Sequence, residues 1–216
     1  MKRFTHKFNF GILVLGLGCT FFLNLILFTP LAEGANSSLG PLSPSLFEGK
    51  EGVWQGNLLD DAYLLTNTED SGSIQYFYVE RDQGEYAISV SVKVEGESSG
   101  LQGAGILYAF HSEIPSYYAF TLDAEGTVSL SRRDEEGFNQ LLGMGTETVR
   151  KGNFNTLTII EQGAAFHLLV NGEEIASVES SRTGEGAVGI VALGTGSFTF
   201  SEFKLNQSTG RLPSLD

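Results

Sequence analysis

Between residues 46 and 205, apolar and polar side chains alternate with a period of two, and Gly, Asn and Asp interrupt the alternation. The clearest run has Ile88, Val90 and Val92 on one side and Ala87, Ser89 and Ser91 on the other. Such alternation is typical of a β-strand with one buried face. Further strands are predicted around Trp54 and at 61–67, 73–80, 104–111, 117–123, 127–133, 138–142, 155–161, 164–171, 174–179, 187–193 and 198–205.

Turn residues separate these predicted strands at short intervals. The pair Asn171-Gly172 is a strong signal for a tight hairpin of type I′, because both central positions of that turn need a positive φ. No amphipathic helix stands out after residue 34. Short strands without helical crossovers favour two stacked antiparallel sheets over any α/β arrangement. The sequence therefore predicts an all-β fold, an antiparallel two-sheet β-sandwich.

The N-terminal segment has a different pattern. Residues 10–28 carry no charge, follow the basic residues Lys2, Arg3 and Lys7, and precede Pro30. This apolar run is longer than the core of most signal peptides and slightly shorter than most spanning helices. We expect residues 1–34 to form a hydrophobic helix, either an uncleaved signal anchor or a signal peptide. In both cases the rest of the chain is expected on the extracytoplasmic side, as a membrane-anchored, secreted or periplasmic domain.

The remaining chain divides into three predicted parts. Residues 35–45 are a polar linker with two prolines, residues 46–206 are the domain, and residues 207–216 are a flexible tail. The single cysteine, Cys19, lies in the apolar segment and is read as a small apolar residue rather than a lipidation site. The exported part has no thiol, so core packing alone must stabilise it.

The chain is acidic, with 13 basic and 26 acidic residues and a formal net charge of −13. A negative field of this size repels phosphate backbones, so nucleic acid is not expected as a partner. The same acidity also promotes solubility and does not by itself indicate a ligand.

Six segments in a fixed order resemble the concanavalin A-like, laminin G-type jelly roll of bacterial secreted proteins. They are AGILYAF at 104–110, YYAFTLDAEGTVSL at 117–130, NTLTII at 155–160, FHLLVNG at 166–172, GAVGI at 186–190 and FTFSEF at 198–203. Trp54 resembles the early tryptophan of the family and is expected in the core. The resemblance implies a jelly-roll fold. The family includes carbohydrate-binding modules, adhesion domains, family 16 glucanases and the 3-keto-disaccharide hydrolase group, so the fold alone leaves the function open.

One acidic segment resembles the glucanase pattern E-x-D-x-x-E. Glu80, Asp82 and Glu85 have this spacing, which in the family places carboxylates on one strand face to attack a glycosidic bond. Here the intervening residues include Arg81 and Gly84 instead of apolar ones. Asp-Gln-Gly is typical of a turn, which would direct the carboxylates into solvent. We therefore predict no catalytic residues here.

His111 and Glu113 follow a predicted strand and are suited to acid–base work or metal binding. No second histidine is placed to help them, and His167 is expected on a sheet face. Acidic pairs and triplets at 60–61, 134–136 and 173–174 offer oxygen ligands to calcium, but none has the spacing of a dedicated loop. We predict no cofactor, with calcium the one metal left open.

Tyrosines are the most informative candidates for a binding site. Tyr76 and Tyr78 share one strand face, and Tyr108 and Tyr117 flank the segment that contains His111. Tyrosine stacks on sugar rings and hydrogen-bonds their hydroxyl groups, so a row of tyrosines across a sheet suits a glycan. The alternative is that these rings only pack the sheet.

These observations leave three hypotheses for the function. The leading hypothesis is an exported, non-catalytic domain that binds an extracytoplasmic glycan or protein through Tyr76, Tyr78, Tyr108, His111 and Tyr117. The second is a glycoside-active hydrolase or lyase of the 3-keto-disaccharide hydrolase or glucanase type. The third is a structural envelope protein. The expected partners are accordingly a polysaccharide or an envelope protein, with the membrane reached through the N-terminal segment.

Overall fold

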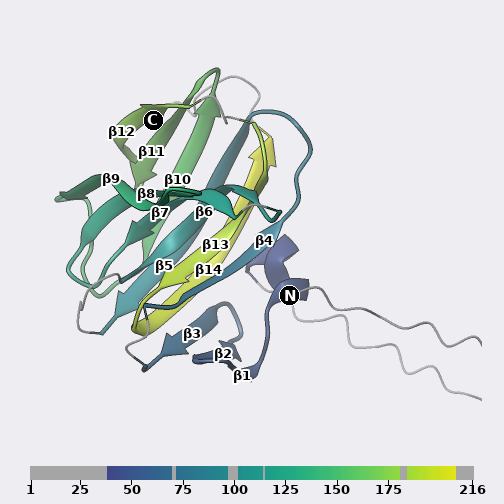
Figure 1. The fold of residues 1–216 in the computed structure, drawn as a ribbon. Helices are drawn as coiled ribbons and strands as arrows, with labels where there is room; N and C mark the ends of the chain where they lie inside the picture. Colours follow the sequence, from purple (N-terminus) through teal and green to yellow (C-terminus); the bar gives the residue numbers. More distant parts are fainter. Residues whose placement is uncertain (1–37, 70–71, 97–101, 114, 181–183, 208–216) are drawn as a thin grey trace, which may run out of the picture. The chain divides into compact units, whose positions relative to one another are not determined.

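The protein folds as two stacked antiparallel sheets (Figure 1). The structure, a computed structural model, describes residues 38–69, 72–96, 102–113, 115–180 and 184–207. Within these ranges the chain forms fourteen strands and one short 3-10 helix. The predicted all-β, two-sheet antiparallel sandwich is confirmed. The predicted N-terminal hydrophobic helix and the tail beyond residue 207 lie outside the described residues, and no helix inside those ranges is long and apolar enough to cross a membrane.

The larger sheet has eight strands. In spatial order they are β1 (Gly49–Glu51), β2 (Trp54–Leu58), β3 (Tyr63–Asn67), β14 (Gly196–Gln207), β5 (Tyr86–Glu95), β10 (Asn155–Gln162), β11 (Ala165–Val170) and β12 (Glu173–Glu179). The hairpin between β11 and β12 has Asn171 at φ 51° and Gly172 at φ 87°, as the type I′ turn requires. The predicted turn at this pair is therefore confirmed.

The smaller sheet has six strands. In spatial order they are β4 (Ile74–Val79), β13 (Ala187–Leu193), β6 (Gly103–His111), β7 (Ser116–Leu122), β8 (Thr127–Asp134) and β9 (Gly137–Gly145). The strand order is not the sequence order, because β13 lies between β4 and β6. This crossover brings residues near 80, 110 and 186 to one end of the sheet.

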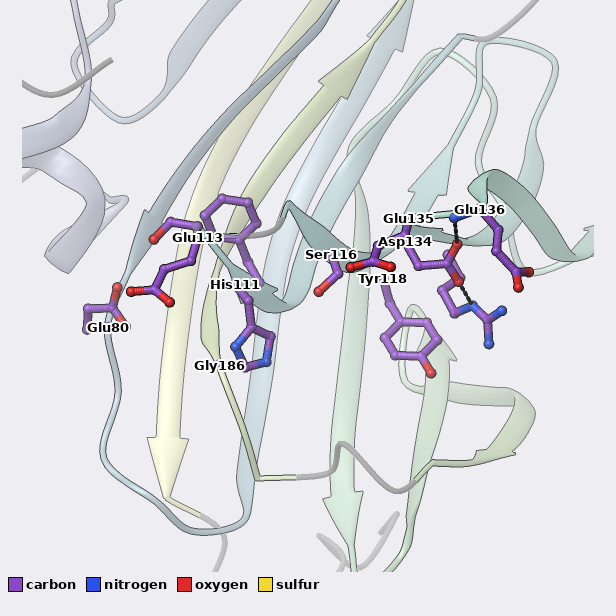
Figure 2. Close-up of a pocket in the computed structure, with 12 residues that line it drawn as sticks. Glu80, His111, Glu113, Ser116, Tyr118, Asp134, Glu135, Glu136 and Gly186 are labelled. Atoms are coloured by element: carbon purple, nitrogen blue, oxygen red, sulfur yellow. Dashed lines mark hydrogen bonds and ion pairs between the residues drawn. The ribbon is translucent and has the colours of Figure 1, made fainter.

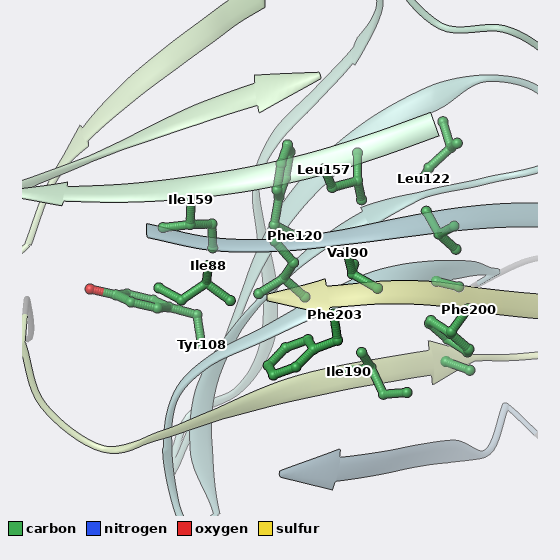
Figure 3. Packing of buried hydrophobic residues seen from close by; sticks show 14 of the residues in the cluster. Ile88, Val90, Tyr108, Phe120, Leu122, Leu157, Ile159, Ile190, Phe200 and Phe203 are labelled. Atoms are coloured by element: carbon green, nitrogen blue, oxygen red, sulfur yellow. The ribbon is translucent and has the colours of Figure 1, made fainter. Parts of the chain in front are cut away.

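The hydrophobic core lies between the two sheets. It is made of the inward side chains of both, and Figure 3 shows Ile88, Val90, Phe120, Leu157 and Phe200 packed together. All five are fully buried. The alternation seen in the sequence is therefore that of the inner faces, and burial of this apolar surface is the main stabilising contribution to the fold. Trp54 also lies in the core, against Phe198, as expected.

The predicted linker is partly folded, which corrects the sequence-based boundary. Residues Gly40–Ser45 form the 3-10 helix η1, and Leu39 and Leu42 are fully buried in the main core. These two leucines are separated by three positions, the period at which side chains of a 3-10 helix share one face. The polar composition of residues 35–45 concealed them, and the domain begins before Leu46.

Candidate functional site

The outer face of the six-stranded sheet carries a cluster of aromatic rings. We call Tyr76, Tyr78, Phe110 and Tyr117 the aromatic face. Phe110 lies 4.9 Å from Tyr76 and 4.6 Å from Tyr78 between ring centroids, and Tyr117 lies 6.1 Å from Phe110. These distances are within the range of favourable ring contacts. Phe110 and Tyr117 are buried, while Tyr76 and Tyr78 are partly exposed.

Strand alternation explains why these rings share one face. In β4, Phe77 points into the main core, so its neighbours Tyr76 and Tyr78 point outward. In β7, Phe120 points inward and Ala119 and Tyr117 point outward. Burial raises the pKa of Tyr117, and the nearby positive charge of Arg133 offsets part of that rise. The Tyr117 hydroxyl therefore stays a neutral hydrogen-bonding group at physiological pH.

The two outer faces of the sandwich differ in chemistry. On the eight-stranded sheet, the outward residues Ser89 and Ser91 of β5 pair with Thr158 and Thr156 of β10. These four positions are polar, as expected of a solvated sheet face. The six-stranded sheet instead presents apolar residues on β4, β13, β6 and β7, which form a second hydrophobic cluster. Only the partly buried members of this cluster, among them Tyr76 and Tyr78, are accessible on this face, because Leu107, Ala119 and Val191 are fully buried.

An open pocket of about 820 Å³ adjoins the aromatic face. Phe110 belongs to both, because it contacts the tyrosines and also lines the pocket. In Figure 2, one group of lining residues comprises Glu80, His111, Glu113 and Gly186, and a second group comprises Ser116, Tyr118 and Asp134, Glu135 and Glu136. The lining comes from the ends of β4, β6, β7, β8 and β13 and from the turns between them.

The pocket is rich in carboxylates. Its lining contains the acidic residues Glu80, Glu113 and 134–136. The basic side chains of the lining are His111 and Arg132. The guanidinium of Arg132 is already paired, with Nε 2.7 Å from Oδ2 of Asp134. The pocket therefore presents hydrogen-bond acceptors and negative charge, which suits a ligand with hydroxyl donors and disfavours an anionic one.

The structure brings four of the predicted binding residues together. Tyr76, Tyr78 and Tyr117 lie in the aromatic face, and His111 lines the adjoining pocket. Sequence reasoning missed Phe110, which joins the two. In the sequence Phe110 is one of several apolar residues of a predicted strand, so it resembles an ordinary core residue.

Tyr108 lies elsewhere, which corrects its predicted position. Its ring is fully buried in the main core, where it packs against Phe166 at 5.0 Å, and its hydroxyl donates to Glu161 Oε1 at 2.8 Å. Tyr108 faces the core because it continues the inward positions Ala104 and Ile106 of β6. Directly after it β6 has a bulge, where Ala109 has φ 52° and the register with β7 shifts between Tyr108 and His111. Tyr108 and Ala109 both face the core, and Phe110 faces outward instead.

The glucanase-like spacing does not produce a row of carboxylates on a strand. β4 ends at Val79 and β5 begins at Tyr86, so the whole motif lies in the connection. Asp82 is exposed, Glu80 lines the pocket, and Glu85 accepts a hydrogen bond from the Gly163 backbone N–H. The segment bends at residues 83–84 but joins strands of different sheets, so it is not a hairpin turn, and the convergent geometry that glycoside cleavage needs is absent from these three residues.

The remaining residue of that motif was misjudged. The turn-like sequence around Arg81 predicts a solvated side chain, but this side chain is 1% exposed and its Nη1 lies 2.7 Å from Oε2 of Glu161. Glu161 itself is fully buried. The sequence did carry a signal: Glu161 continues the inward positions Leu157 and Ile159 of β10, and a carboxylate at an inward position needs a cation or several donors.

The acidic turns considered for calcium do not converge into a metal site. In the part of the chain that the structure describes, no group of three or more His, Cys, Asp or Glu residues is arranged to hold a metal ion. His167 lies on β11, where its Nδ1 is 2.9 Å from Oε1 of Glu174. It is a sheet-face residue, as the sequence predicts.

Comparison with known proteins shows the fold but assigns no family. The sequence matches none of the protein-family profiles and none of the curated proteins with which it was compared. Solved structures do match. The carbohydrate binding module CBM66 from Bacillus subtilis is 11% identical with a TM-score of 0.50, and 73% of this chain covers 92% of that one.

Two further structures belong to proteins of unknown function. One, from Bacillus subtilis, is described as having a galectin-like fold. It is 10% identical with a TM-score of 0.53, and 73% of this chain covers 89% of that one. The other, from Saccharomyces cerevisiae, is 16% identical with a TM-score of 0.55, and 76% of this chain covers all of that one. The chain thus has a jelly-roll β-sandwich fold, which it shares with this carbohydrate binding module and with the protein described as galectin-like.

Proposed function

We propose that this domain binds a glycan across the aromatic face and the adjoining pocket. The observation that carries the proposal is the continuity of the two: Phe110 packs against Tyr76 and Tyr78 and also lines the pocket. A sugar has apolar C–H faces and polar edges, so it needs rings to stack on and hydrogen-bonding groups beside them. This end of the six-stranded sheet supplies both.

A polar strip on the same sheet face supports the proposal. Leu107 and Ala119 of the apolar half are followed, in register, by Ser131 of β8 and Gln140 of β9. Along this row the side chains of the six-stranded sheet therefore change from apolar to hydroxyl- and amide-bearing. The carbohydrate-binding module of the same fold adds support by analogy only.

Charge narrows the class of glycan. The carboxylates of the pocket and the net charge of −13 act together against uronic acids, sulfates and phosphates. We therefore propose a neutral polysaccharide or oligosaccharide as the ligand. We further propose that it is met outside the cytoplasm, because the apolar segment at residues 10–28 with its basic start has the pattern of an export or anchor signal.

Retention of the full-length protein on immobilised neutral polysaccharides (laminarin, xylan, galactan and levan) tests the proposal, with alginate and heparin as anionic comparisons. Tyr78→Ala removes one partly exposed ring of the aromatic face. We expect it to weaken retention at least about tenfold, the effect of removing a residue worth about 1.4 kcal/mol of binding. Phe154→Ala is the matched control, because this phenylalanine is 43% exposed and belongs to neither the aromatic face nor the pocket.

The outcomes separate the competing hypotheses. Retention on a neutral glycan that is lost in Tyr78→Ala and kept in Phe154→Ala supports the proposal. No retention on any of these polysaccharides would reject the sugar ligand and favour an envelope protein as the partner of this face. Release of reducing sugar from a retained polysaccharide would instead support the glycosidase hypothesis.

A further inference from the structure

A buried ion pair lies behind the pocket. Nη1 of Arg81 is 2.7 Å from Oε2 of Glu161, and the side chains are 1% and 0% exposed. Buried ion pairs contribute little net stability, because desolvation offsets their attraction, so their presence calls for another explanation. The two residues come from different parts of the chain, the β4–β5 connection and the end of β10.

The carboxylate of Glu161 is fixed in place by further donors. Its Oε1 accepts from the Tyr108 hydroxyl at 2.8 Å and from the Gly184 N–H at 3.1 Å, and its Oε2 accepts from the Tyr86 N–H at 2.6 Å. A carboxylate held by this many donors has one orientation. Glu161 is therefore a rigid anchor for the guanidinium of Arg81.

The guanidinium of Arg81 holds the chain beside the pocket. Its Nε donates to the Gly186 carbonyl at 2.9 Å and its Nη2 donates to the Glu185 carbonyl at 2.9 Å. Arginine presents its donors in a rigid planar fork, so one anchored guanidinium fixes both carbonyls at once. The rings of Tyr86 and Tyr108 lie 5.3 and 5.6 Å from its central carbon and limit its movement further.

Gly186 transmits this constraint to the binding site. It lines the pocket, has φ +70°, and lies so close to β6 that a Cβ atom there would come within 2.8–3.0 Å of the Ala109–Phe110 backbone. That backbone is the bulge that turns Phe110 outward. Glu80, the residue before Arg81, lines the same pocket. The ion pair is thus connected to two lining segments and to the ring that joins the pocket to the aromatic face.

We propose that Arg81 is a positioning residue. Anchored on Glu161, it holds residues 185–186 against the β6 bulge and thereby sets the shape of the pocket and the outward position of Phe110. Only the identity of the ligand rests on the proposed function. The positioning itself is a property of the ligand-free protein and is tested separately.

Two conservative variants of the full-length protein distinguish positioning from general stability. Arg81→Lys keeps a positive charge beside Glu161 but lacks the fork that reaches both carbonyls. Tyr108→Phe removes one donor to Glu161 from the core side and keeps the ring and every contact of Arg81 with residues 185–186. Both variants are expected to lower the overall stability. Only Arg81→Lys should also alter the shape of the pocket.

Amide hydrogen exchange without ligand is the first measurement. In Arg81→Lys we expect exchange in 184–187 and 109–111 to accelerate at least about tenfold relative to core amides of β5 and β10, a local loss of about 1.4 kcal/mol. In Tyr108→Phe we expect the exchange rates of 184–187 and 109–111 to rise no more than those of the core amides of β5 and β10. Unchanged exchange in Arg81→Lys, or equal acceleration in both variants, would overturn the positioning role.

Retention on laminarin, xylan, galactan and levan is the second measurement. Arg81→Lys should weaken retention about tenfold or more, while Tyr108→Phe should retain the affinity of the unmodified protein. Parallel losses in both variants would mean that binding follows stability alone, against the proposal. If the unmodified protein binds none of these glycans, the proposed function fails, and the exchange result still decides whether Arg81 positions the pocket.

Discussion

Replacement of Glu161 by methionine should be among the most destabilising single changes in this protein. The side chain is fully buried and accepts from Arg81, Tyr86, Tyr108 and Gly184. Methionine of similar length fills the volume but leaves the Arg81 charge uncompensated at 1% exposure. Breaking a buried pair in this way costs about 3–5 kcal/mol. That is a large part of a typical domain stability of about 5–15 kcal/mol.

The double variant Arg81→Met/Glu161→Met gives the sharper test. It removes the uncompensated charge, and in many proteins an apolar replacement of a whole buried ion pair is neutral or stabilising. Here Glu161 also serves two backbone N–H groups and the Tyr108 hydroxyl, which would keep no acceptor. Each unsatisfied buried donor costs about 1–3 kcal/mol, so the double variant should stay destabilised by about 3 kcal/mol or more.

Urea denaturation, followed through the fluorescence of the sole tryptophan, Trp54, measures these differences. Trp54 is suitable because it is 3% exposed in the core and becomes solvated on unfolding. A Tyr108→Phe variant calibrates the loss of one donor to the same carboxylate. A double variant as stable as the unmodified protein would refute the reasoning, because it would show that the carboxylate serves only to neutralise Arg81.

Two further predictions concern the core. Phe200→Ala removes a fully buried ring of β14 and should lower the free energy of unfolding by about 3–5 kcal/mol; a change below about 1 kcal/mol in urea denaturation would contradict the tight packing of this position. Burial raises the pKa of Tyr63 and Tyr108 above the usual value, so the unfolded chain loses these protons first as pH rises. Stability should therefore be complete below about pH 10 and fall above it by up to about 1.4 kcal/mol per pH unit for each tyrosine. Tyr108→Phe should make that fall shallower between pH 10 and 11.5, and an unchanged slope would argue against ionisation of this residue as its cause.

The sequence by itself determined the fold class and several local features. Period-two alternation identifies strands because successive side chains of a strand point to opposite faces, and the core positions Ile88, Val90 and Val92 follow directly from it. The Asn171-Gly172 hairpin was also predictable, since its conformation depends only on the local preference for positive φ. The same logic placed Tyr76 and Tyr78 on one face.

Only the tertiary structure decided which of the candidate residues meet. Arg81 and Glu161 are 80 positions apart, and no local pattern indicates that one will lie beside the other. The face of Phe110 depends on a bulge at Ala109, where one extra residue reverses the alternation beyond it. Local periodicity predicts only which side of its own strand a residue occupies. Strand order and register then bring β4, β6, β7 and β13 together, and they are set by the packing of the whole sandwich.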